Sequence, residues 1–224
     1  MKIGIIGGTG GMGEGFALRW CGKHDIIIGS RDRTKAQEAA DRYQQIAKDA
    51  YKGKAKGTIS GEDNSNLAKN SDMIILSIPY ESINSICSSI SADVSDNCII
   101  VSPIVPMIKK GHGFSYLPFE NGMKSAAELV ADNFGSRSRI LSAFHTISEV
   151  KLRDMKYTVD GDNFVCCDDP KIVKKFKELI EIIGLRMIYL GPLSFAYQAE
   201  LLTPMILNAA MRNRMKQPGL KIFY

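Results

Sequence analysis

Long apolar runs are absent from this sequence. Its 224 residues contain no stretch of apolar residues as long as the roughly 20 that a membrane-spanning helix needs. The apolar start turns to glycines by Gly7, and it lacks the length and the flanks of a signal peptide. We therefore expect no membrane partner and a cytoplasmic location.

Cysteine pairs, metal ligands and nucleic-acid signatures are missing as well. The five cysteines are odd in number and form no C-x-x-C motif, so reduced thiols are the simplest interpretation. The sequence has neither a metal-ligand cluster nor a Ser–His–Asp set, and we expect no metal. The net charge is +5, but the basic residues are scattered and aromatic residues make up only 8%. We expect no nucleic-acid partner; a small anionic ligand accounts for the charge.

The sequence instead alternates short apolar runs with helical stretches, as in a parallel sheet covered by helices. Strands are predicted at residues 2–7, 25–29, 57–60, 73–78, 98–101 and 140–144. Helices are predicted at 13–22, 34–51, 64–70, 81–90 and 124–133, and a loop at 109–122. Past residue 147 the rhythm changes, with strands at 164–167 and 187–190 and helices at 171–183 and 199–215. Pro204 should bend the last helix or delay its start.

A glycine-rich segment follows the first predicted strand. It fits the pattern G-x-G-x-x-G, and a helix and another strand follow it. The first glycine allows a tight turn, the second lets the backbone approach a pyrophosphate, and the third lets the helix pack closely on the strand. Free N–H groups at the helix start can hold the phosphates. The segment reads Gly8-Thr9-Gly10-Gly11-Met12-Gly13.

These patterns together predict an α/β fold with a doubly wound parallel sheet of the Rossmann type and a small C-terminal lobe. We place an NADP-binding domain at residues 1–147. The lobe is placed at residues 148–224.

The end of the second predicted strand indicates which nicotinamide coenzyme binds. An NAD site usually has an acidic residue there, which binds the ribose 2′-hydroxyl. In this sequence Ser30 and Arg31 occupy this position, and Lys35 follows. Arginine suits a 2′-phosphate because its planar fork makes paired, charge-assisted hydrogen bonds. We therefore predict NADP, although Asp32 could reach a hydroxyl instead and the basic side chains could simply be solvated.

Other predicted strands end in distinctive residues, and ligands in open α/β sheets sit outside such ends. Ile78 and Val105 could line the nicotinamide, and Pro79 fixes a loop at the floor of the crevice. His145 is the only histidine at a strand end. It could hydrogen-bond a substrate or be satisfied by the backbone, and position alone does not separate the two.

The chain resembles the coenzyme F420:NADP oxidoreductases of archaea and bacteria. The resemblance covers nearly the whole chain. The last two of the matching motifs are absent from general Rossmann dehydrogenases, which makes them specific to this family. The matching stretches are Gly7-Gly8-Thr9-Gly10, Gly29-Ser30-Arg31, Ser77-Ile78-Pro79, Val101-Ser102-Pro103, Val105-Pro106, Ala143-Phe144-His145-Thr146, Gly191-Pro192-Leu193-Ser194 and Leu202-Thr203-Pro204.

The resemblance implies reversible hydride transfer between NADP(H) and the deazaflavin coenzyme F420, by a homodimer whose partners are small redox coenzymes. It also implies that the lobe at residues 148–224 serves substrate binding and dimerisation. Residues 9–12 would hold the pyrophosphate. Ser30, Arg31 and Lys35 would hold the 2′-phosphate, and His145 would meet the deazaflavin. Gly11 departs from the small polar residue expected there, and residues 155–163 match weakly. Two alternatives are an NADPH-dependent reductase of an imine or keto acid, and a non-catalytic NADP sensor.

Overall fold

Apolar strands separated by amphipathic helices build one central sheet. The structure is a computed structural model, and it describes residues 1–119 and 122–223. The strand order is β10-β9-β8-β5-β4-β1-β2-β3. The strands are β1 (Lys2–Ile6), β2 (Asp25–Ser30), β3 (Ile59–Asp63), β4 (Met73–Leu76), β5 (Ile99–Ser102), β8 (Ile140–Ser142), β9 (Asp162–Cys166) and β10 (Arg186–Gly191). From β3 to β8 all neighbours pair in parallel, which confirms the predicted Rossmann-type sheet.

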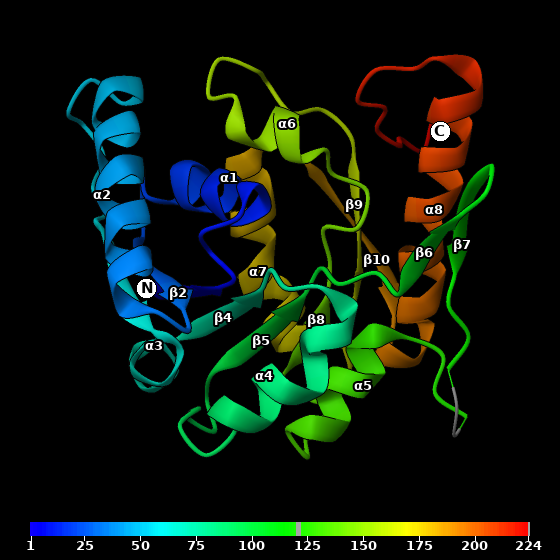
Figure 1. Cartoon of the computed structure of the whole chain (residues 1–224), viewed down its shortest axis with the longest axis horizontal. Helices are drawn as coiled ribbons and strands as arrows, with labels where there is room; N and C mark the ends of the chain where they lie inside the picture. Colours follow the sequence, from blue (N-terminus) through cyan, green and yellow to red (C-terminus); the bar gives the residue numbers. More distant parts are fainter. Residues whose placement is uncertain (120–121, 224) are drawn as a thin grey trace.

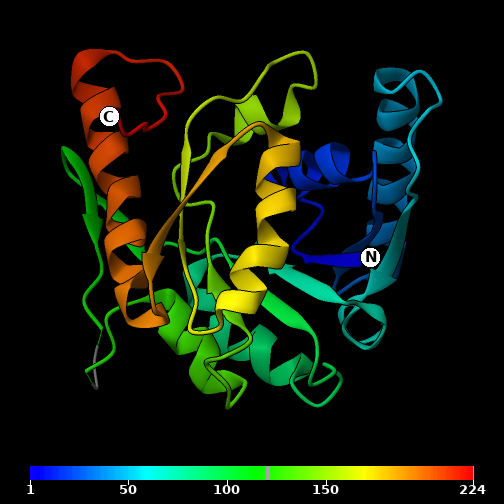
Figure 2. The same cartoon turned by 180° about the vertical axis from the view of Figure 1, so that it is seen from behind.

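Helices cover both faces of this sheet (Figures 1 and 2). On one face lie α1 (Gly11–Trp20), α2 (Arg33–Ala50) and α7 (Pro170–Ile183), and on the other α3 (Asn64–Asn70), α4 (Ile83–Ile90) and α5 (Ala126–Asn133). Successive strand residues point to opposite faces, so Ile5 packs in one core and Ile6 in the other. No helix in the described ranges is both long and apolar enough to cross a membrane.

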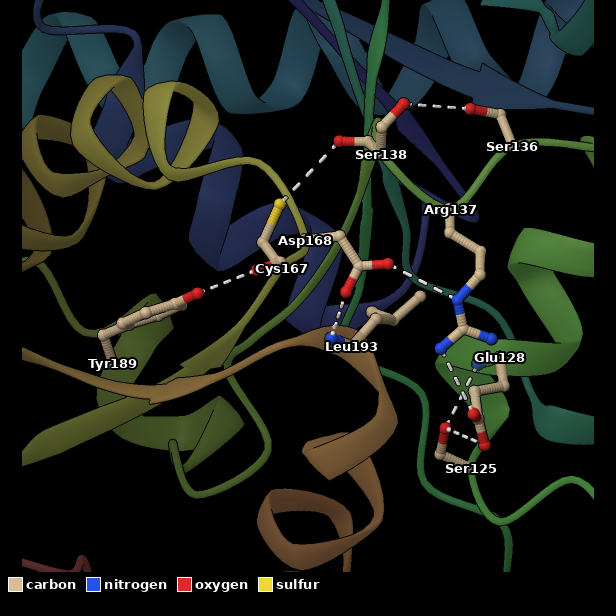
Figure 3. A network of polar contacts seen from close by, with 9 residues as sticks. All are labelled: Ser125, Glu128, Ser136, Arg137, Ser138, Cys167, Asp168, Tyr189 and Leu193. Atoms are coloured by element: carbon tan, nitrogen blue, oxygen red, sulfur yellow. Dashed lines mark hydrogen bonds and ion pairs between the residues drawn. The ribbon is translucent and has the colours of Figure 1, made fainter.

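The two C-terminal strands extend the same sheet. β9 pairs antiparallel with β8, and β10 pairs parallel with β9. A polar network joins the segments that follow β9 and β10 to α5 (Figure 3). Arg137 forms ion pairs with Glu128 of α5 at 3.3 Å and with Asp168 after β9 at 3.4 Å. Asp168 also accepts a hydrogen bond from the N–H of Leu193, after β10, at 2.7 Å. Strands on both sides of residue 147 therefore share one sheet, and the division into 1–147 and 148–224 stays a prediction.

Some sequence-based expectations for the second half of the chain are wrong. A β-hairpin, β6 (Met107–Lys110) and β7 (Gly113–Tyr116), replaces most of the loop predicted at 109–122, of which residues 120–121 lie outside the described part. Gly111 permits its turn with a φ of +49°. The last helix, α8 (Ala196–Asn213), contains Pro204 in its interior, so the proline does not delay its start. The short helix α6 (Glu149–Arg153) has too few residues for a periodic signal.

Candidate active site

The parallel strands end at one common edge, and this edge carries the site. The register pairs Ile6 with Leu76 and Ser102 with Ser142. The loops that follow these strands must therefore meet, and they comprise residues 7–10, 77–79, 103–106 and 143–147. This is where open α/β sheets bind ligands.

Two clefts open along this edge and share Gly10, Ser77, Ile78 and Pro79. The adenosine-side cleft, as we name the first, has a volume of about 360 Å³; its other lining residues are Ile6, Gly7, Thr9, Gly29, Ser30, Arg31, Asn64, Ser82, Ser85 and Ile86. The nicotinamide-side cleft has a volume of about 420 Å³; its other lining residues are Gly11, Met12, Leu76, Tyr80, Pro103, Ile104, Val105, Met107, Phe144, His145, Ile147, Glu149 and Thr203. A dinucleotide laid across the shared wall would reach both.

The glycines of the phosphate loop are required for different structural reasons. A Cβ on Gly8 would lie 2.6 Å from the Ile5 oxygen, and one on Gly13 would lie 2.5 Å from the Gly8 Cα, so both are needed for packing. A Cβ on Gly10 would meet only the Gly7 oxygen, at 3.5 Å. Gly10 is also the N-cap of α1, and no side chain in the described ranges caps this helix. Open space before uncapped N–H groups fits a pyrophosphate.

The end of β2 supports a 2′-phosphate more than a 2′-hydroxyl. Asp32, the competing acidic residue, is the N-cap of α2, and its Oδ1 accepts hydrogen bonds from the N–H groups of Thr34 at 2.9 Å and Lys35 at 3.3 Å. Arg31 lines the adenosine-side cleft and forms no ion pair within residues 1–119 and 122–223. The Lys35 side chain is exposed on α2 and lines neither cleft. The Arg31 guanidinium is thus available for a phosphate, whereas the Asp32 carboxylate is already engaged in capping α2.

His145 lies at the wall of the nicotinamide-side cleft and is only 6% exposed. Burial lowers its pKa to about 3, and the nearby main chain of Ser102 offsets part of that shift. The ring is therefore neutral at physiological pH, and neither ring nitrogen has a hydrogen-bond partner of good geometry among the described residues. Buried polar atoms are usually paired. A neutral imidazole facing a cleft can donate one hydrogen bond to a ligand and accept another.

The backbone that carries His145 is held by distant side chains. Phe144 has a φ of +70°, which is rare for a bulky residue. Its N–H donates to Asn163 Oδ1 at 2.8 Å, and the Thr203 hydroxyl donates to the His145 carbonyl oxygen at 2.7 Å. Strained backbone of this kind persists where surrounding contacts impose it. The position of the ring is therefore specified by β9 and α8.

Comparisons with known proteins show the family to which the chain belongs. The family model described as NADP oxidoreductase, coenzyme F420-dependent, matches residues 2–106. The F420-dependent NADP reductase of Methanocaldococcus jannaschii is 35% identical over 99% of this chain and 98% of its own length. That of Methanothermobacter thermautotrophicus is 34% identical over 99% of this chain and 94% of its own length. The chain belongs to this family.

Solved structures support the fold of this family member. The crystal structure of a proposed F420-dependent NADP reductase from Arthrobacter sp. FB24 superimposes with a TM-score of 0.78 at 19% identity, covering 100% of both chains. A diketoreductase structure superimposes with a TM-score of 0.64 at 14% identity, covering 94% of this chain and 71% of its own. At such identities the likeness is one of fold.

In this member of the family, α1 and α6 pack together beside the phosphate loop. A Cβ on Gly11 would overlap Glu149 Oε1 and lie 2.5 Å from its Cδ, and one on Gly15 would lie 2.6 Å from Leu152 Cγ. Four residues further on, the Arg19 guanidinium donates to the Leu152 oxygen at 3.0 Å and to three more α6-side carbonyls. Residues four apart share one helix face. A side chain at residue 11 would therefore require the Glu149 carboxylate to move aside.

Helix α8 organises the other side of the nicotinamide-side cleft. Glu200 is fully buried and accepts hydrogen bonds from the Tyr116 hydroxyl at 2.7 Å and from the N–H groups of Ala126 at 2.9 Å and Ala127 at 3.1 Å. Burial raises the pKa of its carboxyl to about 7. Asn208 bonds both the N–H and the carbonyl of Phe114, at 2.7 and 2.8 Å. The hairpin and the start of α5 are therefore attached to α8.

Most of the site residues expected from the sequence line a cleft. Gly8 and Gly13 are buried beneath the loop, and Lys35 stands apart. The sequence analysis did not single out Met107 or Glu149 because neither the hairpin nor α6 was predicted. Thr203 belongs to the motif Leu202-Thr203-Pro204, one of those that carry the family resemblance. Its hydrogen bond to the His145 carbonyl shows how this motif contributes to the site.

Proposed function

We propose that this chain transfers a hydride reversibly between NADP(H) and coenzyme F420. The observation that supports this most is the pair of clefts joined at the phosphate loop, with Arg31 in one and a neutral His145 in the other. The curated relatives named F420-dependent NADP reductase match nearly the whole chain. Their names favour a deazaflavin over an imine or keto acid, and an enzyme over a sensor.

The two coenzymes supply the redox chemistry, and the protein supplies binding and orientation. We assign residues 9–12 to the pyrophosphate, with the N–H groups at the start of α1 as donors. Ser30 and Arg31 hold the 2′-phosphate, and Lys35 reaches it if its exposed side chain turns inward. The nicotinamide lies against Ile78, Pro79 and Val105. These assignments follow from which residues line each cleft.

His145 is assigned to the deazaflavin. Because its pKa lies near 3, it acts as a neutral hydrogen-bonding group that positions the acceptor ring. It neither removes a proton from carbon nor supplies a full positive charge. Direct hydride transfer between two stacked rings removes no proton from carbon, and the proton that completes the reduced deazaflavin comes from solvent. No hydrogen bond joins the His145 ring to a titratable side chain among the described lining residues.

Two measurements test this proposal. Mixing the enzyme with NADPH and coenzyme F420 should bleach the deazaflavin absorbance, and adding NADP to the reduced coenzyme should restore it. NADPH deuterated at the transferred position should deliver its label to the reduced deazaflavin. Label that appears in water would contradict direct transfer. Turnover of an imine or keto acid without any bleaching would replace the proposal with the small-metabolite alternative.

We further propose that residues 148–224 form a lobe for substrate binding and dimerisation, and that the protein is a homodimer. Helix α8 exposes large apolar side chains, including Leu201 (40% exposed), Met205 (51%) and Met211 (43%). Exposed apolar groups gathered on one helix are typical of protein interfaces. Light scattering on the purified chain should give a dimer mass, and Met205→Glu should shift it toward a monomer. A monomeric wild type would contradict the proposal.

We also propose a cytoplasmic location. All five cysteines are free and buried, as in proteins of reducing compartments. Fractionation of cells that produce the protein should place it in the cytosolic fraction.

A further inference from the structure

Two segments free of acidic residues meet beside the nicotinamide-side cleft. No Asp or Glu occurs at residues 97–119 or at 201–224. The first segment contains the β6–β7 hairpin, and the second contains most of α8 and the turn beyond it. We call their exposed cations the basic rim, which comprises Lys109, Lys110, Arg212, Arg214 and Lys216.

The hairpin and α8 lie side by side, which brings these cations together (Figures 1 and 2). Asn208 bonds both main-chain groups of Phe114. Further along α8, Arg212 Nη1 lies 3.7 Å from where a Cβ on Gly113 would stand. Gly113 pairs with Lys110 across the hairpin. Cations of both segments therefore gather at the tip of the hairpin.

The basic rim begins at the cleft itself. Met107 lines the cleft and shares a face of β6 with Lys109, because alternate strand residues point the same way. Thr203 also lines it, and Arg212 lies about 14 Å further along α8 at 1.5 Å per residue. The turn that carries Lys216 is also attached near the cleft. The hydroxyl of Ser148, which lies between the cleft residues Ile147 and Glu149, donates a hydrogen bond to the side chain of the next residue, Gln217. Lys109 thus lies two residues from a cleft residue along β6, and the cations of the C-terminal segment lie further out along and beyond α8.

None of the five cations forms an ion pair within the described residues. Lys221, in the same C-terminal segment, is paired with Asp160 at 2.8 Å, and Arg186 is paired with Asp162 at 2.7 Å. Those pairs lie near the starts of β9 and β10 and consolidate the fold. In the basic rim, Lys109 Nζ lies 5.9 Å from the centre of the Phe114 ring and Arg212 donates to the Asn208 carbonyl oxygen at 3.5 Å. No carboxylate among the described residues neutralises its charge.

We infer that the basic rim binds the anionic glutamate tail of the deazaflavin substrate while the ring lies in the cleft. The inference rests on the proposed function and adds a subsite to it. Cations spaced along the exit path attract successive carboxylates and steer the substrate into the cleft. They lie away from the reacting rings, so they act on substrate capture and leave the hydride step unchanged.

The test compares coenzyme F420 with a deazaflavin core that lacks the tail, both with saturating NADPH. The wild type should have a lower KM for the tailed coenzyme, and this advantage should disappear at about 0.5 M salt, where the Debye length is only a few Å. Replacing both Lys109 and Lys110 by alanine should raise KM for the tailed coenzyme roughly 5- to 30-fold, the scale of two screened charge pairs. KM for the tail-less core, KM for NADPH and kcat should not change.

Lys174 and Lys175 provide a matched control, since they are adjacent and exposed on α7, none of whose residues lines either cleft. Their double alanine variant should leave every constant unchanged. Arg212→Ala repeats the test without changing a residue of the hairpin. It should raise KM for the tailed coenzyme and leave KM for the tail-less core unchanged. Equal KM values for the two substrates in the wild type, or equal changes for both in the variants, would overturn the inference. Reduction of the tail-less core would still support the proposed function in that case; reduction of neither deazaflavin would contradict both.

Discussion

The phosphate-loop side and the α8 side of the active site are built in opposite ways. The phosphate loop is one contiguous segment, and its key features are backbone groups at the start of α1. The α8 side is assembled from partners far apart in sequence: Thr203 and His145 are 58 residues apart, Glu200 and Ala126 are 74 apart, and Asn208 and Phe114 are 94 apart. The phosphate-loop side is thus encoded locally, whereas the α8 side depends on the complete fold.

This contrast predicts that changes on the two sides have separable effects. Changes in the loop should affect coenzyme binding and leave the fold intact wherever the structure has room for a side chain. Changes on the α8 side should alter turnover or stability and leave NADPH binding alone.

The largest effect is expected at Gly10. Gly10→Val should abolish binding of both NADPH and NADH, because the added side chain fills the space before the uncapped start of α1. Its Cβ meets only one atom, at 3.5 Å, so circular dichroism and the Tm should stay close to wild type. The matched variant is Gly13→Ala, whose Cβ would lie 2.5 Å from the Gly8 Cα; it should lower the Tm. Wild-type NADPH affinity in a folded Gly10→Val would refute the loop assignment.

The next largest effect is expected at His145. His145→Ala should lower turnover with coenzyme F420 by roughly 10- to 1000-fold, the scale of one lost preorganised donor, with NADPH affinity nearly unchanged. Thr203→Val should cause a smaller loss, because it removes only the bond that holds the His145 carbonyl. Since the pKa of His145 is about 3, turnover of the wild type should show no titration of this residue near neutral pH. A large loss of NADPH affinity would place His145 on the nucleotide side instead.

Arg31 tests the choice of coenzyme. Arg31→Ala should weaken NADPH binding by roughly 10- to 150-fold, the range for hydrogen bonds to charged groups, and should barely change NADH binding. The adjacent Arg33 is engaged with Glu62 at 3.1 Å, so Arg33→Ala should have little effect on either coenzyme. Titrations monitored by nicotinamide fluorescence measure both. Equal losses for NADPH and NADH would exclude a role in binding the 2′-phosphate.

A smaller effect of opposite sign is expected at Glu149, whose carboxylate lies over Gly11 at the phosphate loop. Glu149→Gln should tighten NADPH binding by roughly 2- to 5-fold at low salt, the scale of one screened charge interaction, because it removes a negative charge from the path of the pyrophosphate. The gain should shrink as salt is added. Glu181→Gln on α7 is the control of equal charge. Weaker NADPH binding in Glu149→Gln would show that the carboxylate assists the coenzyme.

The last effect concerns stability, and it depends on the protonation of Glu200. Burial raises the pKa of this carboxyl from an ordinary 4.5 to about 7. Between these values the folded protein holds a proton that the unfolded chain has released, so the contribution to stability is complete below the lower value and is lost as pH rises to the upper one. Glu200→Gln cannot ionise, so its Tm relative to wild type should rise by roughly 7–14 °C as pH increases across this window, at about 1.36 kcal/mol per pKa unit and about 2–4 °C per kcal/mol. A pH-independent difference in Tm would contradict the assignment.

Sequence reasoning reached the parts of the molecule that depend on local patterns. The strand and helix alternation predicted the parallel sheet, because a strand buried on both faces is continuously apolar, as residues 73–76 are. The phosphate loop and the basic end of β2 could be predicted because both are short contiguous motifs. The hairpin and α6 could not be predicted, since four-residue strands and a five-residue helix are too short for periodicity to register.

The sequence by itself thus determined the Rossmann-type sheet, the glycine-rich turn before α1 and the absence of an acidic residue at the position that would select NAD. Only the tertiary structure decided that Asp32 is occupied as a helix cap, that Glu149 covers Gly11 and that His145 is neutral. The physical reason is the range of the interactions. Turns and helix starts are decided by neighbouring residues, whereas desolvation and long-range hydrogen bonds exist only once the distant elements α6 and α8 have packed around the site.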